Sequence, residues 1–155
     1  MSDTVDAAEL AKQYATDTEA AKRAAEDDLV PTGTYEGQGQ GYMGSIVDKA
    51  DHLFYGDPMF RVQVELFNVE GKSRPFFFNA TPVEKMRGDR MAGESKAGLQ
   101  LAKATGTVGK PFDETLEATK QVRLKYRVRM SLGGTNKTTG QSYEPGNWLD
   151  AVRAL

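Results

Sequence analysis

The 155-residue chain contains no cysteine and only one histidine, His52. Without cysteine it forms neither disulfide bonds nor thiolate metal sites, which fits a reducing compartment. A single histidine does not complete a usual zinc ligand set, so we interpret His52 as a surface or loop residue. Hydrolase mechanisms that pair a serine or cysteine nucleophile with a histidine have no cysteine and only one histidine available here. No pair of acids is placed to suggest carboxylate catalysis. We therefore expect no metal, no cofactor and no enzymatic activity.

Long apolar runs are also missing. No stretch approaches the roughly 20 apolar residues of a membrane-spanning helix. Residues 1–6 are acidic and lack the apolar core of a secretory signal. Together with the lack of cysteine, these observations predict a cytoplasmic protein without a membrane partner.

Negative charge is concentrated at one end of the chain. Residues 1–30 hold eight acids and three bases, a net charge of −5; because the whole chain carries −2, residues 31–155 carry +3. Residues 5–28 are rich in alanine and other helix formers but poor in large apolar residues, which predicts a helix with little surface to bury. We predict an acidic arm over residues 1–30, helical or disordered, and a folded domain over residues 31–155. Such an arm either stays solvated or docks onto a partner.

Short alternating segments and turns dominate the remaining sequence. In residues 59–67, apolar Phe60, Val62 and Val64 alternate with polar residues, the period of a half-buried strand. We expect strands over residues 33–37 with a continuation at 45–47, and over 59–67, 73–79, 122–130 and 147–155, with a loop over 81–93 and one short helix over 95–104. Five strands with a helix between the third and fourth predict a mainly β, OB-like Greek-key barrel. That fold binds oligonucleotides on its strand 2–3 face.

Residues 122–130 carry the strongest functional pattern. Successive strand side chains point to opposite faces, so one face holds four cations: Arg123, Lys125, Arg127 and Arg129. The opposite face, expected to be buried, holds Val122, Leu124, Tyr126, Val128 and Met130. Side chains two residues apart lie about 6.6–6.8 Å apart along a strand, close to the phosphate spacing of a single strand. Solvated strand faces usually mix charges because like charges repel. The stripe therefore favours phosphate binding, with a solvated face as the alternative.

Aromatic residues lie beside further cations. Sequence-tolerant binding of single strands requires cations for the backbone and aromatic rings for the bases. Both are present here: Lys72 and Arg74 precede Phe76, Phe77 and Phe78, and Tyr42, Tyr55, Phe60 and Arg61 lie around the preceding strand. Strand parity leaves two alternatives. Either Phe76 and Phe78 face the core and Phe77 points outward, or Arg74 sets the outward parity and Phe77 is buried. The first is favoured because it exposes less apolar surface.

Residues 39–44 spell G-x-G-x-x-G. A dinucleotide site requires that motif to close a strand and open a helix. Here strand character resumes at Ile46 and Val47, and no βαβ unit follows. We interpret the glycines as a bulged, flexible passage between strand segments, which can also close over a ligand.

Several short segments carry a family resemblance: PTGTYEG at 31–37, GDPM at 56–59, FFFN at 76–79, the helix from Leu99 to the ATG at 104–106, and GNW at 146–148. Residues 31–155 resemble phage-encoded OB-fold single-stranded DNA-binding proteins. The resemblance implies coating of single strands during phage DNA replication or recombination, in the host cytoplasm. Many such proteins recruit partners through an acidic C-terminal tail. Residues 151–155 are not acidic, so the acidic N-terminal arm is the alternative place to recruit replication or recombination proteins.

The sequence thus predicts non-sequence-specific binding of single-stranded DNA. The expected phosphate-binding and stacking residues are Arg61, Lys72, Arg74, Arg123, Lys125, Arg127, Arg129, Tyr42, Tyr55 and Phe77. A structural or adaptor β-barrel of a phage particle, its basic stripe facing an acidic neighbour, is the alternative, followed by a module that inhibits a host protein. The sequence leaves the oligomeric state open, a homo-oligomer included.

Overall fold

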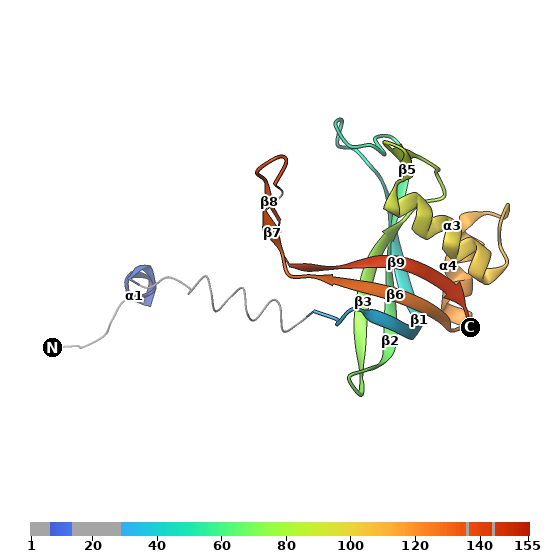
Figure 1. Ribbon diagram of the computed structural model, residues 1–155, viewed down its shortest axis with the longest axis horizontal. Helices are drawn as coiled ribbons and strands as arrows, with labels where there is room; N and C mark the ends of the chain where they lie inside the picture. The colour runs from blue at the N-terminus through green and yellow to red at the C-terminus, as the bar shows by residue number, and fades with distance from the viewer. Residues whose placement is uncertain (1–6, 14–28, 136, 144) are drawn as a thin grey trace. The chain divides into compact units, whose positions relative to one another are not determined.

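The computed structural model describes residues 7–13, 29–135, 137–143 and 145–155 (Figure 1). The chain divides into two compact units, residues 1–29 with 132–146 and residues 30–131 with 147–155. In the first unit, α1 (Ala7–Lys12) has no buried residue, and a small hairpin pairs β7 (Gly134–Thr135) with β8 (Ser142–Tyr143). The rest of the helix predicted over 5–28, apart from residue 13, lies outside the described residues.

The second unit is built on one five-stranded sheet. Its order is β3 (Lys72–Ala80), β2 (Pro58–Val69), β1 (Gly33–Ile46), β6 (Leu124–Ser131) and β9 (Gly146–Ala154). Residues 33–37 of β1 pair antiparallel with β6, whereas residues 37–46 pair antiparallel with β2. One long strand therefore belongs to both halves of the sheet, and Figure 1 shows β2 and β3 running at a steep angle to β6 and β9. The five predicted strands are confirmed, and the two expected pieces of the first are continuous.

The mainly β fold is confirmed, but the sheet is open and does not close into a barrel. β3 and β9 are its two edges. On β9, one backbone donor is satisfied by a side chain of α3 (Gly93–Thr105): the Gln100 Oε1 accepts a hydrogen bond from the Val152 N–H at 2.8 Å. A backbone donor that is satisfied by a helix side chain does not need a strand partner. The start of β9 is fixed separately, because the Asn147 side chain bonds both the N–H and the carbonyl of Val30.

Two helices, not one, connect β3 to β6. The predicted helix over 95–104 is confirmed as α3, which ends at Gly106 in the left-handed conformation. The second helix, α4 (Phe112–Gln121), was missed because its sequence is mostly polar and buries only Thr115, Leu116 and Thr119. The loop predicted over 81–93 contains a small hairpin of β4 (Met86–Arg87) and β5 (Arg90–Met91).

A close approach explains the glycine inside α3. A Cβ at Gly98 would collide with the backbone carbonyl oxygen of Thr81, the residue that follows β3. The Thr81 N–H also bonds the Glu94 carbonyl at 3.1 Å. Gly98 therefore costs helix propensity but lets α3 pack directly against the end of β3.

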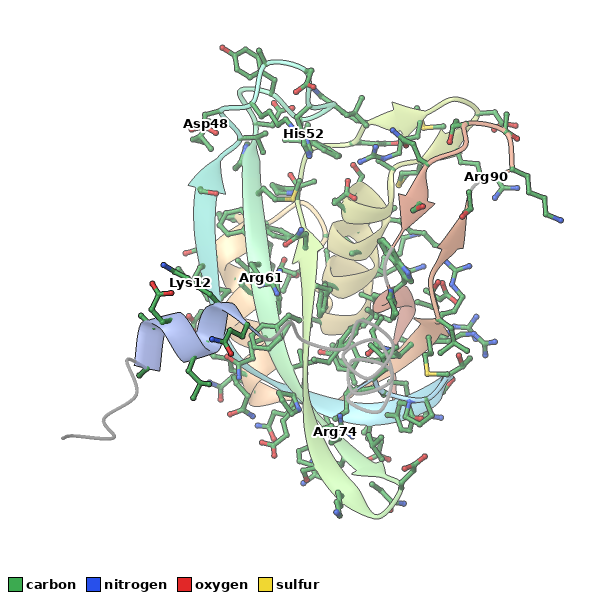
Figure 2. All side chains as sticks on the ribbon, turned by 90° about the vertical axis from the view of Figure 1, so that its left-hand side faces the viewer. Lys12, Asp48, His52, Arg61, Arg74 and Arg90 are labelled. Atoms are coloured by element: carbon green, nitrogen blue, oxygen red, sulfur yellow. The ribbon has the colours of Figure 1, made fainter. Side chains whose placement is uncertain are left out.

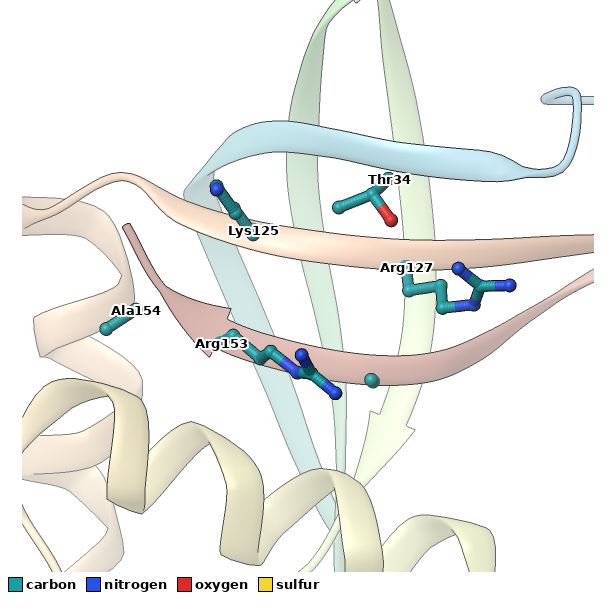
Figure 3. A pocket seen from close by; sticks show the side chains of 6 residues that line it. Thr34, Lys125, Arg127, Arg153 and Ala154 are labelled. Carbon is teal, nitrogen blue, oxygen red and sulfur yellow. The ribbon is translucent and has the colours of Figure 1, made fainter.

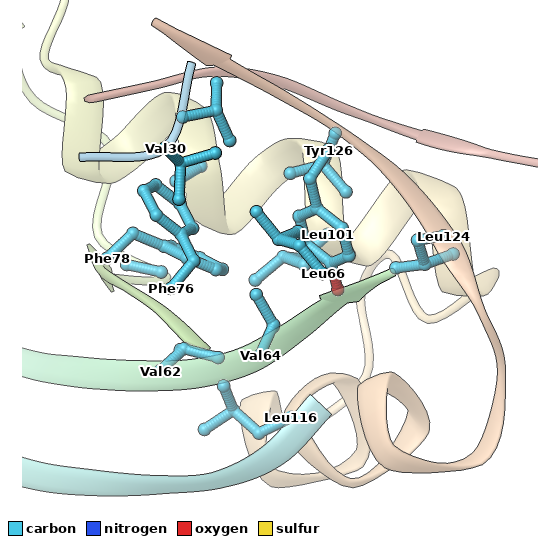
Figure 4. Close-up of a cluster of buried hydrophobic side chains, with 14 of the residues drawn as sticks. Val30, Val62, Val64, Leu66, Phe76, Phe78, Leu101, Leu116, Leu124 and Tyr126 are labelled. Carbon is cyan, nitrogen blue, oxygen red and sulfur yellow. The ribbon is translucent and has the colours of Figure 1, made fainter. Parts of the chain in front are cut away.

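The core lies between the sheet and the two helices (Figure 4). β2 contributes Val62, Val64 and Leu66, and α3 and α4 contribute Leu101 and Leu116. These residues, with others from β3 and β6, form one cluster of buried side chains. The alternation predicted for residues 59–67 is therefore confirmed. No helix in the described part of the chain is long and apolar enough to cross a membrane.

Candidate nucleic-acid interface

The cationic face of β6 is exposed. Lys125, Arg127 and Arg129 point outward, whereas Leu124, Tyr126 and Val128 are buried in the core. The predicted alternation is thus confirmed within the strand. It is wrong for Val122, which is 44% exposed, because β6 begins only at Leu124 and Val122 caps the end of α4.

The two ends of this face interact with neighbouring groups. The Arg123 guanidinium lies 3.8 Å from a carboxylate oxygen of Glu36 and 4.4 Å from the ring centroid of Phe67. The Arg129 Nε lies 3.6 Å from the Asp150 carboxylate. All four charged side chains are at least one-third exposed, so these pairs are weak and screened by salt.

Between these ends lies a concentration of positive charge. Lys125 and Arg127 from β6 and Arg153 from β9 line a shallow hollow of about 310 Å³, which we call the cationic groove (Figure 3); its remaining lining residues are Thr34, Ala151 and Ala154. Within the described residues, none of these three cations has a carboxylate within ion-pair distance. Charges held this way are open to an anionic ligand.

Arg153 was not among the predicted site residues. The sequence placed it in the last strand, but residues 147–155 show no clean alternation that would assign its face. Burial in β9 is equally irregular, with only Val152 fully buried. Its one signal is a lone cation in an otherwise apolar C-terminal stretch.

Two further hollows lie along β9. The first, of about 320 Å³, shares no lining residue with the cationic groove; it is lined by Arg129, which follows Arg127 on the exposed face of β6, and by Arg90, Lys96, Asp150 and Trp148. The next, of about 340 Å³, which we call the seam hollow, shares Trp148 and lies between the edge strands β3 and β9 and the first turn of α3. It contains Arg61, Phe77 and Asn79. Arg129 and Trp148 therefore link cations on β6 to rings at the seam.

The seam hollow presents two exposed rings. Phe77 is 44% exposed, while Phe76 and Phe78 are buried, so the first parity alternative is confirmed. The Arg61 guanidinium lies 5.0 Å from the Phe77 ring centroid, a cation–π contact. Trp148, the only tryptophan, is 54% exposed. The sequence did not predict Trp148 as a binding residue, because a single aromatic side chain in a strand without clear alternation can equally belong to the core.

Tyr42 is not on this face. It pairs across the strands with Val62, whose side chain is in the core. Its hydroxyl donates to the Glu117 Oε1 at 3.1 Å, and the Lys120 ammonium lies 5.7 Å from its ring. The hydrogen bond to Glu117 raises the pKa of Tyr42, and the hydrogen bonds from Lys120 and Tyr42 lower the pKa of the Glu117 carboxyl. Tyr42 therefore holds α4 against β1 on the side away from Phe77.

Arg74, Lys72 and Tyr55 also lie apart from the seam hollow. Arg74 pairs with Leu66, is half-buried and shares the parity of Phe76. Lys72 is exposed at the start of β3. Tyr55, 56% exposed, lies in the loop between β1 and β2. Figure 2 shows this loop, with Asp48 and His52, at one end of the sheet and Arg74 towards the other, with Arg61 between them.

The loop that carries Tyr55 and His52 is ordered by its own contacts. The Lys85 ammonium lies 2.7 Å from the Asp57 carboxylate and donates to the Leu53 carbonyl at 2.9 Å. The His52 Nδ1 accepts a hydrogen bond from the Phe54 N–H at 3.1 Å, and His52 is exposed, as predicted. Across residues 7–13, 29–135, 137–143 and 145–155, no three His, Asp or Glu side chains cluster as a metal site would require.

The glycine motif at 39–44 lies inside β1. The register with β2 shifts between Gly39 and Gly41, so a β-bulge is present, as the sequence suggested. Gly39 faces α4, where an added Cβ would overlap Thr119. The motif thus serves strand packing, and no helix follows it.

Comparison with protein-family models, characterised proteins and solved structures finds no match for this chain. The functional argument therefore depends on the residues and their arrangement.

Proposed function

We propose that the protein binds single-stranded DNA without sequence specificity and without catalysis. The strand follows the cationic groove along β6, passes Arg129 and Trp148, and reaches Phe77 at the seam. Lys125, Arg127, Arg153 and Arg61 contact phosphates, and Phe77 and Trp148 stack on bases. The order of the five strands, with helices between β3 and β6, fits the OB-like arrangement of a partly open Greek-key barrel.

One observation carries this proposal. Three cations that have no carboxylate within ion-pair distance among the described residues line the cationic groove, two exposed rings line the seam hollow, and the hollow that contains Arg129 shares Trp148 with the seam hollow. Cations that follow the backbone and rings that stack on bases are the two requirements for sequence-tolerant single-strand binding. A duplex hides its bases inside the stack, so rings placed beyond the cations favour the single-stranded form.

The biological setting follows from the resemblance to phage-encoded single-stranded DNA-binding proteins. The proposed role is to coat single strands during phage DNA replication or recombination. The acidic segment of residues 1–30 is the proposed contact for replication or recombination proteins, because its charge has the wrong sign for DNA.

A titration tests the proposal. Fluorescence anisotropy with labelled oligo-dT and a duplex of equal length should show tighter binding to oligo-dT. With four phosphate contacts, from Arg61, Lys125, Arg127 and Arg153, the log–log salt slope should be about −3, since each contact on a single strand contributes about −0.7. Equal affinity for duplex, or a flat salt response, rejects the proposal. Weak adsorption that does not depend on oligonucleotide length favours the adaptor protein of a phage particle instead.

A further inference from the structure

We infer that a row of three residues across β1, β2 and β3 forms a flat seat for one nucleobase, and that the seat requires the bare backbone of Gly41. The inference deepens the proposed function and rests on it. Gly41 pairs with Gln63, and Gln63 pairs with Phe77. Because directly paired residues project to the same face of a sheet, the three positions form one row on the outer face, which we call the Gly41 row.

Gly41 differs from the other glycines of β1. An added Cβ at Gly37 would crowd Tyr126, at Gly39 it would overlap Thr119, and at Gly44 it would lie 2.8 Å from the Phe60 ring. These three glycines are therefore explained by packing. A Cβ at Gly41 would meet no atom within 4 Å, and its φ is not in the left-handed region.

The β-bulge between Gly39 and Gly41 does not require glycine at position 41 either, because the φ of Gly41 is not in the left-handed region, so packing and backbone conformation leave this glycine unexplained. Glycine in a strand interior weakens it, because the unfolded chain loses more conformational freedom and no side chain packs. A strand glycine that the fold does not require marks a place where another group approaches the backbone closely. At Gly41 that group would come from solvent, on the outer face.

The rest of the row has the chemistry of a base seat. The Phe77 ring has the Arg61 guanidinium 5.0 Å from its centroid and keeps 44% of its surface exposed. Gln63 is half-buried, and within the described residues its amide makes no hydrogen bond. An amide carries both donors and an acceptor, so it can pair with an edge of any of the four bases, which agrees with binding that tolerates sequence.

The dimensions also fit. Neighbouring strands are about 4.8 Å apart, so the backbone of Gly41 lies about 10 Å from that of Phe77. A base stacked on Phe77 and bonded to Gln63, together with its sugar, would extend over that distance. A side chain at position 41 would then occupy the place of the nucleotide.

The decisive variant is Gly41→Val, with Ser45→Val as the matched control. Ser45 is exposed on the same face of β1 and pairs with Met59, two rows away from Gln63. We expect both variants to melt at or above the temperature of the wild type. Gly41→Val should bind oligo-dT about ten-fold more weakly, the order of one lost stacking contact, and Ser45→Val should bind like the wild type. With an abasic oligonucleotide of the same length, all three proteins should bind equally.

The outcomes separate the seat from the proposed function. If wild type prefers oligo-dT to duplex but Gly41→Val binds oligo-dT normally, the seat is refuted and single-strand binding stands. If the wild type has no preference for oligo-dT, the proposed function fails first. Should Gly41→Val melt early, the glycine is structural and the seat loses its main support. Gln63→Leu then decides whether any base seat exists: it should weaken oligo-dT binding but not abasic binding, and equal effects on both oligonucleotides refute a base contact at this row.

Discussion

Reversing two charges of the cationic groove tests the proposed function most directly. Arg127→Glu with Arg153→Glu is the best pair, because both guanidinium groups are exposed and line the same hollow. Arg127 faces Thr34 across the strands, so its reversal creates no like-charge pair there. Lys125 is less suitable, since it pairs with Glu36 and a glutamate at position 125 would face a glutamate. The melting temperature of the double variant should therefore change little.

The expected loss of affinity follows from the salt dependence. Each phosphate contact on a single strand contributes about −0.7 to the log–log slope, so losing two of four contacts changes the slope from about −2.8 to about −1.4. At 0.1 M salt, a slope of about −0.7 per contact corresponds to roughly five-fold in affinity for each contact, or about 25-fold for two contacts. Added repulsion between the new carboxylates and phosphates increases the loss further.

The measurement is an anisotropy titration with oligo-dT at several salt concentrations. Lys103→Glu with Lys110→Glu is the control, because it changes the net charge equally at two exposed lysines of α3 and of the segment before α4. If both double variants lose the same affinity, only the net charge matters and the groove is not the site. If the groove variant unfolds, the cations of β6 and β9 are structural and the reasoning fails.

Two further predictions concern stability. Gly98→Ala should lower the free energy of unfolding by about 2–3 kcal/mol, although alanine is the better helix former, because the new methyl group collides with the Thr81 carbonyl; urea denaturation measures the change, and a gain in stability would contradict the close approach. Tyr126→Phe should raise stability by about 1 kcal/mol, because the Tyr126 hydroxyl is buried without a hydrogen-bond partner in the described structure and its burial raises the pKa of this tyrosine. Thermal melts and urea denaturation of that variant check the second prediction, and a clear loss of stability would show that the hydroxyl is bonded.

The sequence predicted those parts of the fold that depend on period and local turn chemistry. The alternation in residues 59–67 and 122–130 placed Val62, Val64, Tyr126 and Val128 on buried faces, because a strand with one face in the core must repeat every two residues. Helix α3 was found despite Gly98, since Gly106 marks its end. Helix α4 has only Phe112 and Leu116 as large apolar residues, too few to produce a recognisable stripe.

Barrel closure depends on contacts that no local pattern carries. One backbone donor of β9 is taken by a side chain from another element: the Val152 N–H bonds Gln100 of α3. A glutamine in a helix gives no sign in the sequence that it caps the edge of a strand 52 residues away. The predicted number of strands was therefore correct, whereas the predicted barrel does not close.

The candidate site also contains residues that a local sequence pattern predicts and residues that only contacts between distant elements bring together. The two groove cations of β6, Lys125 and Arg127, could be placed from the sequence, because they repeat on one face of one strand. Arg153 and Trp148 reach the same surface only through the position of β9, and Tyr42, predicted beside them, was drawn to α4 by Glu117. The edges of β3 and β9 do not pair with each other, and the seam hollow that contains both Phe77 and Trp148 lies where these two edges face each other. A sheet closed by pairing β9 with β3 would bring the two backbones together at that hollow, so the proposed stacking site depends on the two edges remaining unpaired.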